Sequence, residues 1–279
     1  MKINEENINQ IVEKYQNGIS GCKLSKEYNC SADTIYEILK KNNIKIRSNK
    51  ENSRKYNCNH NYFENIDTED KAYWLGFIYA DGYITSKRTS DSQKFGITLS
   101  IQDRKHLEKL NQCLNSNYPI REYTQIAGYK PGNKYCRLLI TSQKLVDDLK
   151  RHGVIENKTN ILEPPNIAEE LVPHFIRGYM DGDGCITSYL NNGYLKHCVK
   201  LLGTEKMLDY FNDFLKKNFQ YKIPKYYKRK EDQQVMSLEI ASNIRSKNFL
   251  DLIYKNATIY LDRKYDKYLK LCEFMNSRT

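Results

Sequence analysis

Two aspartates, Asp81 and Asp183, each end an apolar stretch and are each followed by glycine. The stretches read Trp74-Leu75-Gly76-Phe77-Ile78-Tyr79-Ala80-Asp81-Gly82 and Ile176-Arg177-Gly178-Tyr179-Met180-Asp181-Gly182-Asp183-Gly184. In both, small residues recur four positions apart, so they share one face of a helix and allow two helix backbones to approach closely. This spacing predicts two packed helices whose terminal carboxylates lie side by side.

Two carboxylates at adjoining helix C-termini are electrostatically unfavourable, because the backbone carbonyls already make each C-terminus negative. A cation bound between the carboxylates would offset this repulsion. Mg²⁺ or Mn²⁺ is the expected cation, since such ions take carboxylate and phosphate oxygens as ligands. We therefore predict that Asp81 and Asp183 are metal ligands.

The two stretches together resemble the LAGLIDADG motif of homing endonucleases. The resemblance covers roughly Tyr62 to Met275, and the first copy departs from the pattern by carrying Tyr79 where the second has Asp181. It implies an α+β fold in which two pseudo-symmetric αββαββα halves form a DNA-binding saddle. It also implies a monomeric enzyme that hydrolyses one phosphodiester per half, using divalent metal, at a long asymmetric site in double-stranded DNA.

The order of the predicted elements repeats between the halves, here residues 67–165 and 166–279. Each half has a motif helix, a strand pair, a helix, a second strand pair and another helix, judged from apolar periodicity and turn residues. Asp103 and Thr204 stand at equivalent helix starts, where both are good N-caps. The predicted strands cover residues 83–85, 94–101, 118–124, 135–141, 185–188, 195–202, 222–230 and 235–241, and a last helix covers about 261–275.

The resemblance also implies a lysine near each acid, where it would orient or polarise the attacking water. Lys158 and Lys264 occupy the matching positions, each after the terminal helix region of its half. Relatives often place a polar residue near the metal-bound water at the positions of Asp103 and Thr204. For these last two residues, a role as helix cap alone is the alternative.

Residues 1–47 are predicted to form three short helices. Ser31 can cap the third helix, in which Ile35, Ile38 and Leu39 face inward. Two helices with a tight connection form a helix-turn-helix, whose second helix enters the major groove. A small helical bundle without DNA contact is the alternative. The predicted DNA contacts in this region are Thr34, Tyr36, Lys40, Lys41 and Arg47.

Residues 48–66 are predicted to be a basic linker that tracks phosphates between two DNA-binding units. In the second half, the basic and aromatic run at residues 222–230 is predicted to contact phosphates and bases. Polar residues that alternate along strands 94–101, 135–141, 195–202 and 235–241 are the expected base readers. The contacts named from the basic run are Lys225, Tyr227, Lys228 and Arg229.

Composition agrees with a polyanion-binding protein. The chain of 279 residues has a formal net charge of +11 and 23 tyrosines. A basic charge suits DNA, although ribosomal, membrane-surface and regulatory proteins share it. Eight scattered cysteines without a CxxC pair indicate reduced thiols. Together with the lack of a signal peptide or membrane-length apolar run, they predict a cytoplasmic protein.

Two other functions are compatible with the sequence. One is a transcriptional regulator that keeps the LAGLIDADG scaffold and a helix-turn-helix but does not cut DNA. The other is an RNA maturase on the same fold. The paired acids and lysines favour the nuclease. An intein is not expected, because the chain begins at Met1 and lacks a terminal His-Asn pair. A free-standing or intron-encoded enzyme of a bacterium or phage fits better.

Overall fold

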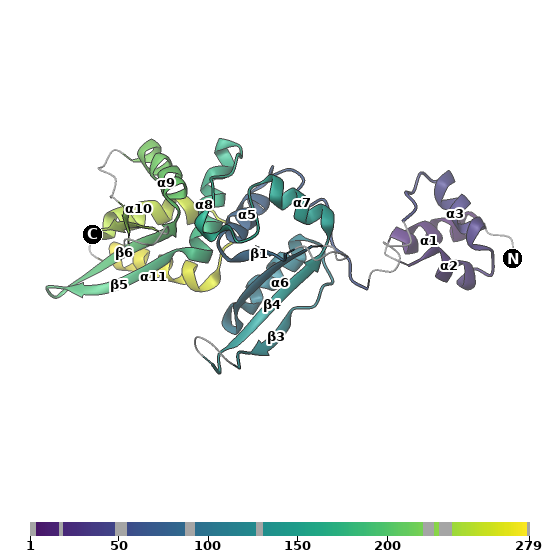
Figure 1. The fold of residues 1–279 in the computed structure, drawn as a ribbon, viewed down its shortest axis with the longest axis horizontal. Coiled ribbons are helices and arrows are strands. Elements are labelled where there is room, and N and C mark those ends of the chain that lie inside the picture. Colours follow the sequence, from purple (N-terminus) through teal and green to yellow (C-terminus); the bar gives the residue numbers. More distant parts are fainter. Residues whose placement is uncertain are drawn as a thin grey trace. The chain divides into compact units, whose positions relative to one another are not determined.

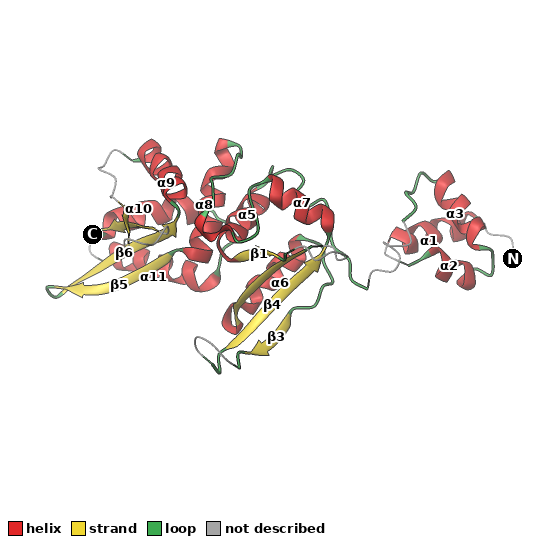
Figure 2. Ribbon diagram, viewed as in Figure 1, coloured by secondary structure: helices red, strands yellow, loops and turns green. Residues whose placement is uncertain are grey.

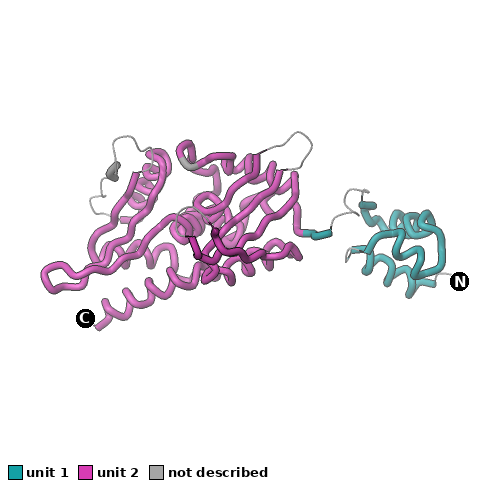
Figure 3. Tube along the Cα trace, turned by 60° about the horizontal axis from the view of Figure 1, so that its bottom comes forward, with its two compact units in different colours: residues 1–57 teal, residues 58–279 magenta. Residues whose placement is uncertain are grey.

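The computed structural model describes residues 4–16, 19–47, 55–86, 93–126, 131–219, 226–228 and 236–277. The chain divides into two compact units, residues 1–57 and 58–279, which are coloured separately in Figure 3.

Unit 1 contains the three predicted helices, α1 (Glu5–Gln16), α2 (Gly21–Glu27) and α3 (Ala32–Lys41). Serine side chains cap two of them, because Ser20 accepts a hydrogen bond from Lys23 N and Ser31 accepts one from Thr34 N. One fully buried cluster joins all three helices, so the unit has a core of its own. The cluster consists of Ile11, Tyr15, Leu24, Ile35 and Leu39.

Unit 2 consists of two halves with the same element order, as predicted (Figures 1 and 2). The first half runs α5 (Glu69–Asp81), β1 (Gly82–Ile84), β2 (Lys94–Ser100), the 3₁₀ turn η1 (Ile101–Asp103), α6 (Arg104–Cys113), β3 (Arg121–Thr124), β4 (Lys134–Thr141) and α7 (Gln143–Arg151). The 3₁₀ turn η2 (Lys158–Asn160) ends the first half, and the second half begins with the 3₁₀ turn η3 (Glu169–Leu171). It continues with α8 (Val172–Asp183), β5 (Cys185–Asn191), β6 (Tyr194–Gly203), α9 (Glu205–Asn218), β7 (Tyr226–Lys228), β8 (Met236–Ala241), α10 (Asn243–Tyr254) and α11 (Asp262–Asn276).

Each half has one antiparallel four-stranded sheet, ordered β1-β2-β4-β3 in the first and β5-β6-β8-β7 in the second. In the first sheet the pairs Ile97↔Leu138 and Phe95↔Ile140 are buried, and helices α6 and α7 pack against these strands. Successive side chains of a strand point to opposite faces. The alternation predicted from sequence therefore places polar residues such as Thr98 and Arg137 on the face away from the core.

Helices α5 and α8 pack backbone to backbone at the centre of unit 2. A Cβ on Gly76 would lie 2.0 Å from Phe175 O, and a Cβ on Gly178 would lie 1.9 Å from Tyr73 O. No side chain fits at such distances, so glycine is required at both positions. The small-residue spacing in the sequence predicted this contact correctly.

Replacing Gly178 with alanine is expected to destabilise unit 2 by about 3 kcal/mol or more, since its methyl group meets backbone and the two helices must separate. Urea unfolding measures this, and the single tryptophan, Trp74, is buried in α5 and reports on it. Gly193→Asn is the control, because Gly193 has φ +77° and no atom within 4 Å of its Cβ position. Equal unfolding midpoints for the two variants would contradict the packing argument.

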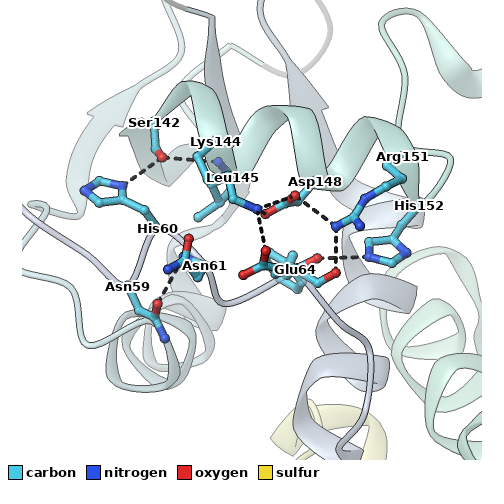
Figure 4. A network of polar contacts seen from close by, with 11 residues as sticks. Asn59, His60, Asn61, Glu64, Ser142, Lys144, Leu145, Asp148, Arg151 and His152 are labelled. Carbon is cyan, nitrogen blue, oxygen red and sulfur yellow. Dashed lines mark hydrogen bonds and ion pairs between the residues drawn. The ribbon is translucent and has the colours of Figure 1, made fainter.

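The polar segment that precedes the first motif helix is held against α7 (Figure 4). His60 Nδ1 lies 2.8 Å from Ser142 Oγ, Arg151 donates to Glu64 O at 2.6 Å, and His152 Nε2 lies 2.9 Å from Phe63 O. The sequence assigned residues 48–66 to a linker. Residues 58–64 instead belong to unit 2, where the carbonyls of Phe63 and Glu64 and the side chain of His60 bond to residues in α7 and at its two ends.

Candidate active site

The two acids come together at the ends of the packed helices. Asp81 is the last residue of α5 and Asp183 the last of α8, and Gly82 and Gly184 follow them. Asp81 Oδ2 lies 3.4 Å from the position that a Cβ on Gly182 would occupy. The negative charge of Asp183 also raises the pKa of Asp81, so the close approach of the helices brings the two acids near each other, as the motif spacing predicted.

The ionised form of both carboxyl groups is disfavoured. Burial, and then the negative charge of Asp183, raise the pKa of Asp81 to about 6. Burial likewise raises the pKa of Asp183, although its side chain keeps access to solvent. Neither carboxylate has a hydrogen bond or ion pair with the described residues. Two poorly compensated carboxylates beside helix C-termini favour a bound cation.

Lys158 and Lys264 lie beside the acids. Lys158 Nζ donates to Ala80 O at 3.1 Å, and Lys264 Nζ donates to Met180 O at 2.7 Å, Gly182 O at 3.0 Å and Gly184 O at 2.6 Å. Burial lowers the pKa of both amines, that of Lys264 to about 8. The two ammonium groups in turn lower the pKa of both acids, so the four groups form one electrostatic cluster.

Asp103 and Thr204 have different contacts despite their equivalent positions. Thr204 is the predicted cap, because its Oγ1 accepts from Met207 N at 3.3 Å while donating to Leu162 O at 2.7 Å. Asp103 occupies the predicted N-cap position of α6, but without the side-chain bond of a cap. Both of its carboxylate oxygens accept from Arg263 Nε at 3.0 Å instead. This ion pair joins the first half to α11 of the second half.

A buried polar network beside the acids was not predicted from the sequence. Asp181 is fully buried and accepts from Tyr73 OH at 2.7 Å, Tyr254 OH at 2.5 Å and Leu261 N at 2.8 Å. A sequence signal was present, since Asp181 occupies the motif position that carries Tyr79 in the first copy. Its three donors hold it inside the protein, so it joins the two halves.

An ion pair between buried Arg177 and half-buried Glu69 also ties the halves together. Arg177 of α8 is 1% exposed and donates to Glu69 of α5 at 2.6 Å, and to Ile253 O and Ile259 O at 2.9 Å each. Every one of these contacts crosses between elements far apart in sequence. The pair was not predicted, because Arg177 stands inside an otherwise apolar motif.

The predicted DNA contacts of unit 1 fall into two groups. Lys40 and Lys41 are exposed at the end of α3, and Thr34 is half-buried in its first turn. Tyr36 and Arg47 are engaged within the unit. The Tyr36 ring packs over Gly21, while Arg47 donates to Ile19 O and its guanidinium lies 4.1 Å from the Tyr15 ring centre. Both side chains thus have contacts within unit 1 and are partly buried, and their role in DNA contact stays a prediction.

In unit 2, Lys225 and Arg229 lie outside the described residues, and only the backbone of Tyr227 and Lys228 is described, in β7. The first sheet carries a basic and aromatic face that the sequence indicated only by alternation. Arg137 lies opposite both Thr98 and Arg121, and its guanidinium is 5.6 Å from the Tyr123 ring centre.

No group of three or more His, Cys, Asp or Glu side chains within the described ranges could hold a metal by itself. A metal at Asp81 and Asp183 therefore needs additional oxygen ligands. This donor set fits Mg²⁺ or Mn²⁺, since Mg²⁺ usually takes one or two carboxylates, several waters and phosphate oxygens of the substrate. In the described part of the chain, no helix is long and apolar enough to cross a membrane.

A sequence model of the LAGLIDADG-like domain matches residues 68–152, the first half of unit 2. No curated protein sequence matches the chain. Among solved structures, the LAGLIDADG meganuclease I-AabMI bound to uncleaved DNA is 14% identical and covers 74% of this chain and 92% of its own, with a TM-score of 0.50. The homing endonuclease I-GzeII in complex with its DNA target is 13% identical over 74% and 91% of the chains, with a TM-score of 0.50.

The homing endonuclease I-LtrWI bound to target DNA gives a TM-score of 0.51 at 9% identity, over 75% of this chain and 92% of its own. Likeness at such identity concerns the fold, and it agrees with the domain match and with the two motif copies. The chain therefore contains a LAGLIDADG-like domain and has the fold of the two-motif LAGLIDADG homing endonucleases.

Proposed function

We propose that the chain is a site-specific endonuclease that hydrolyses one phosphodiester in each strand of double-stranded DNA. The observation that carries the proposal is the convergence of Asp81 and Asp183 at the ends of two packed helices, with two buried lysines beside them. The similar structures are described as meganucleases or homing endonucleases bound to DNA, which supports the extension to this chain.

Asp81 and Asp183 would hold Mg²⁺ or Mn²⁺, with the remaining ligands from water and DNA. Such a metal lowers the pKa of a bound water and stabilises the charge that develops on the phosphate. The carboxylates keep their place through the α5–α8 packing. Lys158 and Lys264 hold positive charge next to the position of the phosphate, where it stabilises negative charge in a partly desolvated site.

The surface for DNA would be the polar faces of the two sheets. Arg121 and Arg137 on the first sheet suit guanine or phosphate, because a guanidinium donates two parallel hydrogen bonds to either. The two sheets carry different side chains, so the target would be long and lack true symmetry, and a single chain would bind it as a monomer. Unit 1 would read adjacent DNA as a helix-turn-helix, using the exposed end of α3. We propose that the enzyme acts on DNA in the cytoplasm of a bacterium or on phage DNA.

Selection of cleaved sites from a randomised duplex library, in Mg²⁺ and separately in EDTA, tests the proposal. We expect one sequence family, cut in both strands, that appears only with Mg²⁺. Enrichment of bound but uncut DNA in both conditions would instead identify a non-cleaving regulator. Binding only to structured RNA in a parallel selection would identify a maturase.

The raised pKa of Asp81 gives a pH test that needs no DNA. A carboxyl whose pKa is raised on folding to about 6 stabilises the fold below its unfolded pKa, and this contribution is lost as the pH rises through 6. Bound Mg²⁺ requires the ionised form, so its apparent affinity is expected to fall about tenfold per pH unit below pH 6.

Thermal melting with and without Mg²⁺ therefore checks this expectation. Mg²⁺ should raise the melting temperature at pH 7.5 and have little effect at pH 5. In Asp81→Asn the response to Mg²⁺ should be small at both values. A stabilisation by Mg²⁺ that is the same at pH 5 and pH 7.5 in the unmodified chain would contradict the assignment.

A further inference from the structure

The two lysines beside the acids differ in how many of their N–H donors are already used. An ammonium group has three donors and, while protonated, no acceptor. Lys264 directs all three at backbone carbonyls, those of Met180, Gly182 and Gly184, at 2.6 to 3.0 Å. Lys158 has one partner within the described ranges, Ala80 O at 3.1 Å, so two donors remain.

The carbonyls that Lys264 binds surround one of the acids. Gly182 and Gly184 are the residues on either side of Asp183, and Met180 O lies one turn earlier. Glycines on both sides give this turn more conformational freedom than any other residue pair would. The last carbonyls of a helix also lack partners within the helix. Met180 O already accepts from Gly184 N at 3.0 Å, and the ammonium is a second donor to it. By also binding the carbonyls of Gly182 and Gly184, the buried ammonium fixes the backbone that carries Asp183.

The corresponding turn in α5 is built differently. Asp81 is preceded by Ala80, so only one glycine, Gly82, adjoins it. A single ammonium contact, to the carbonyl before Asp81, accompanies this less flexible turn. The exposed fractions follow the same order, with Lys264 at 3% and Lys158 at 9%.

We propose that the two lysines have divided roles: Lys264 is a positioning residue that holds Asp183 through its backbone, and Lys158 supplies the ammonium that contacts the DNA phosphate or its water. This division rests on the proposed nuclease function for the part that concerns DNA. The role of Lys264 does not depend on the nuclease function, because its contacts position Asp183 for any ion that this carboxylate binds.

The Mn²⁺ affinity of the full chain, measured without DNA, distinguishes a positioning residue from a nearby positive charge. Loss of the first should weaken Mn²⁺ binding, whereas loss of the second should strengthen it. Removing a cation next to two carboxylates should tighten Mn²⁺ binding on electrostatic grounds. Lys158→Met is expected to do so, by about threefold. Lys264→Met is expected to weaken Mn²⁺ binding about tenfold or more, since loss of a residue that orients a ligand costs that much. Tighter Mn²⁺ binding in both variants would reject the positioning role of Lys264.

Arginine variants test geometry at constant charge. Lys264→Arg keeps the charge, but a planar guanidinium cannot direct three bonds at three converging carbonyls. We therefore expect it to weaken Mn²⁺ binding as Lys264→Met does, whereas Lys158→Arg should bind Mn²⁺ like the unmodified chain. Normal Mn²⁺ affinity in Lys264→Arg would show that charge alone matters and would reject the proposal.

Because Lys264 variants could unfold, one measurement uses the unmodified chain. With ¹⁵N-labelled lysine, a held ammonium exchanges its protons slowly enough to give an Nζ resonance. We expect this resonance for Lys264 in the DNA-free protein and not for Lys158, with assignment from the arginine variants. The reverse pattern, or a visible resonance for both, would overturn the division.

After a cleaved DNA site has been identified, single-turnover cleavage rates at increasing Mn²⁺ concentration compare the catalytic defects of the two methionine variants. High Mn²⁺ should restore cleavage by Lys264→Met, whose defect is metal binding, and should leave Lys158→Met slow. Rescue of Lys158→Met instead of Lys264→Met would reverse the assigned roles. Failure to find any cleaved DNA would reject the nuclease, while the Mn²⁺ and resonance results would still decide the role of Lys264.

Discussion

Asp81→Asn and Asp183→Asn are each expected to abolish double-strand cleavage while specific DNA binding persists. Each change removes one carboxylate from the pair at the end of the packed helices and adds no bulk. We expect a loss of about a thousandfold or more in the double-strand rate, which corresponds to about 4 kcal/mol of transition-state stabilisation. Single-turnover cleavage of the selected site in Mg²⁺, together with a binding titration in Ca²⁺, measures both quantities.

The stability of the metal-free protein provides a check that does not depend on activity. The two carboxylates destabilise each other, because Asp183 raises the pKa of Asp81 and burial raises the pKa of both. Either Asn variant should therefore unfold at a higher temperature than the unmodified chain at pH 7.5.

Asp181→Asn is the matched control, since it changes the same residue type two positions before Asp183. Asp181 accepts three hydrogen bonds inside the protein, so this variant should lose about 1–3 kcal/mol of stability. If Asp183→Asn also destabilises the chain, or if either Asn variant at Asp81 or Asp183 still cuts both strands at the normal rate, the assignment of the acids is wrong.

The central helices and sheets could be predicted because their signals are local. Small residues four positions apart specified the α5–α8 contact, and that contact alone places Asp81 beside Asp183. The alternation in residues 94–101 specified which face of β2 is buried. In both cases the spacing of the residue types in the sequence equals the structural repeat of the helix or strand. The spacing therefore predicts which residues share a face.

The errors arose where a distant residue competes with a local preference. Asp103 has a good capping side chain at a helix start, but Arg263, 160 positions later, takes both of its oxygens. Likewise, the polar stretch at residues 58–64 reads as a linker, yet its Phe63 and Glu64 carbonyls bond to His152 and Arg151 at the end of α7. Neither Arg263 nor the end of α7 can be identified as a partner from one sequence, because the residues near Asp103 and in 58–64 carry no information about distant contacts.

The lysines show the limit of a resemblance. The matching positions led to Lys158 and Lys264, and both lie at the acids. Their equivalence in sequence concealed unequal contacts, one carbonyl for Lys158 and three for Lys264. The difference follows from the glycine on each side of Asp183, which was visible in the sequence but has meaning only once the partner atoms are placed.

Deleting residues 1–47 is expected to weaken DNA binding without changing the chemical step at saturating protein. Unit 1 has its own core, and every acid and lysine of the candidate active site belongs to unit 2. With residues 58–64 anchored, the connection comprises residues 48–57, which reach about 35 Å when extended. That length suffices for an adjoining major groove. The dissociation constant should rise about ten- to a thousandfold, since the contacts of one module contribute a few kcal/mol.

Footprinting of the truncated chain should lose protection on one flank of the site only, because a single copy of this module accompanies a core of two halves. In the full chain, Lys40→Ala with Lys41→Ala should weaken binding less than the deletion does, and should reduce the slope of log affinity against log salt by about two, as expected for two phosphate contacts. The charge-matched control is Lys216→Ala with Lys217→Ala on α9, which packs on the core side of the second sheet and should change neither quantity. A truncated protein that binds its site as tightly as the full chain, with an unchanged footprint, would show that residues 1–47 do not read DNA.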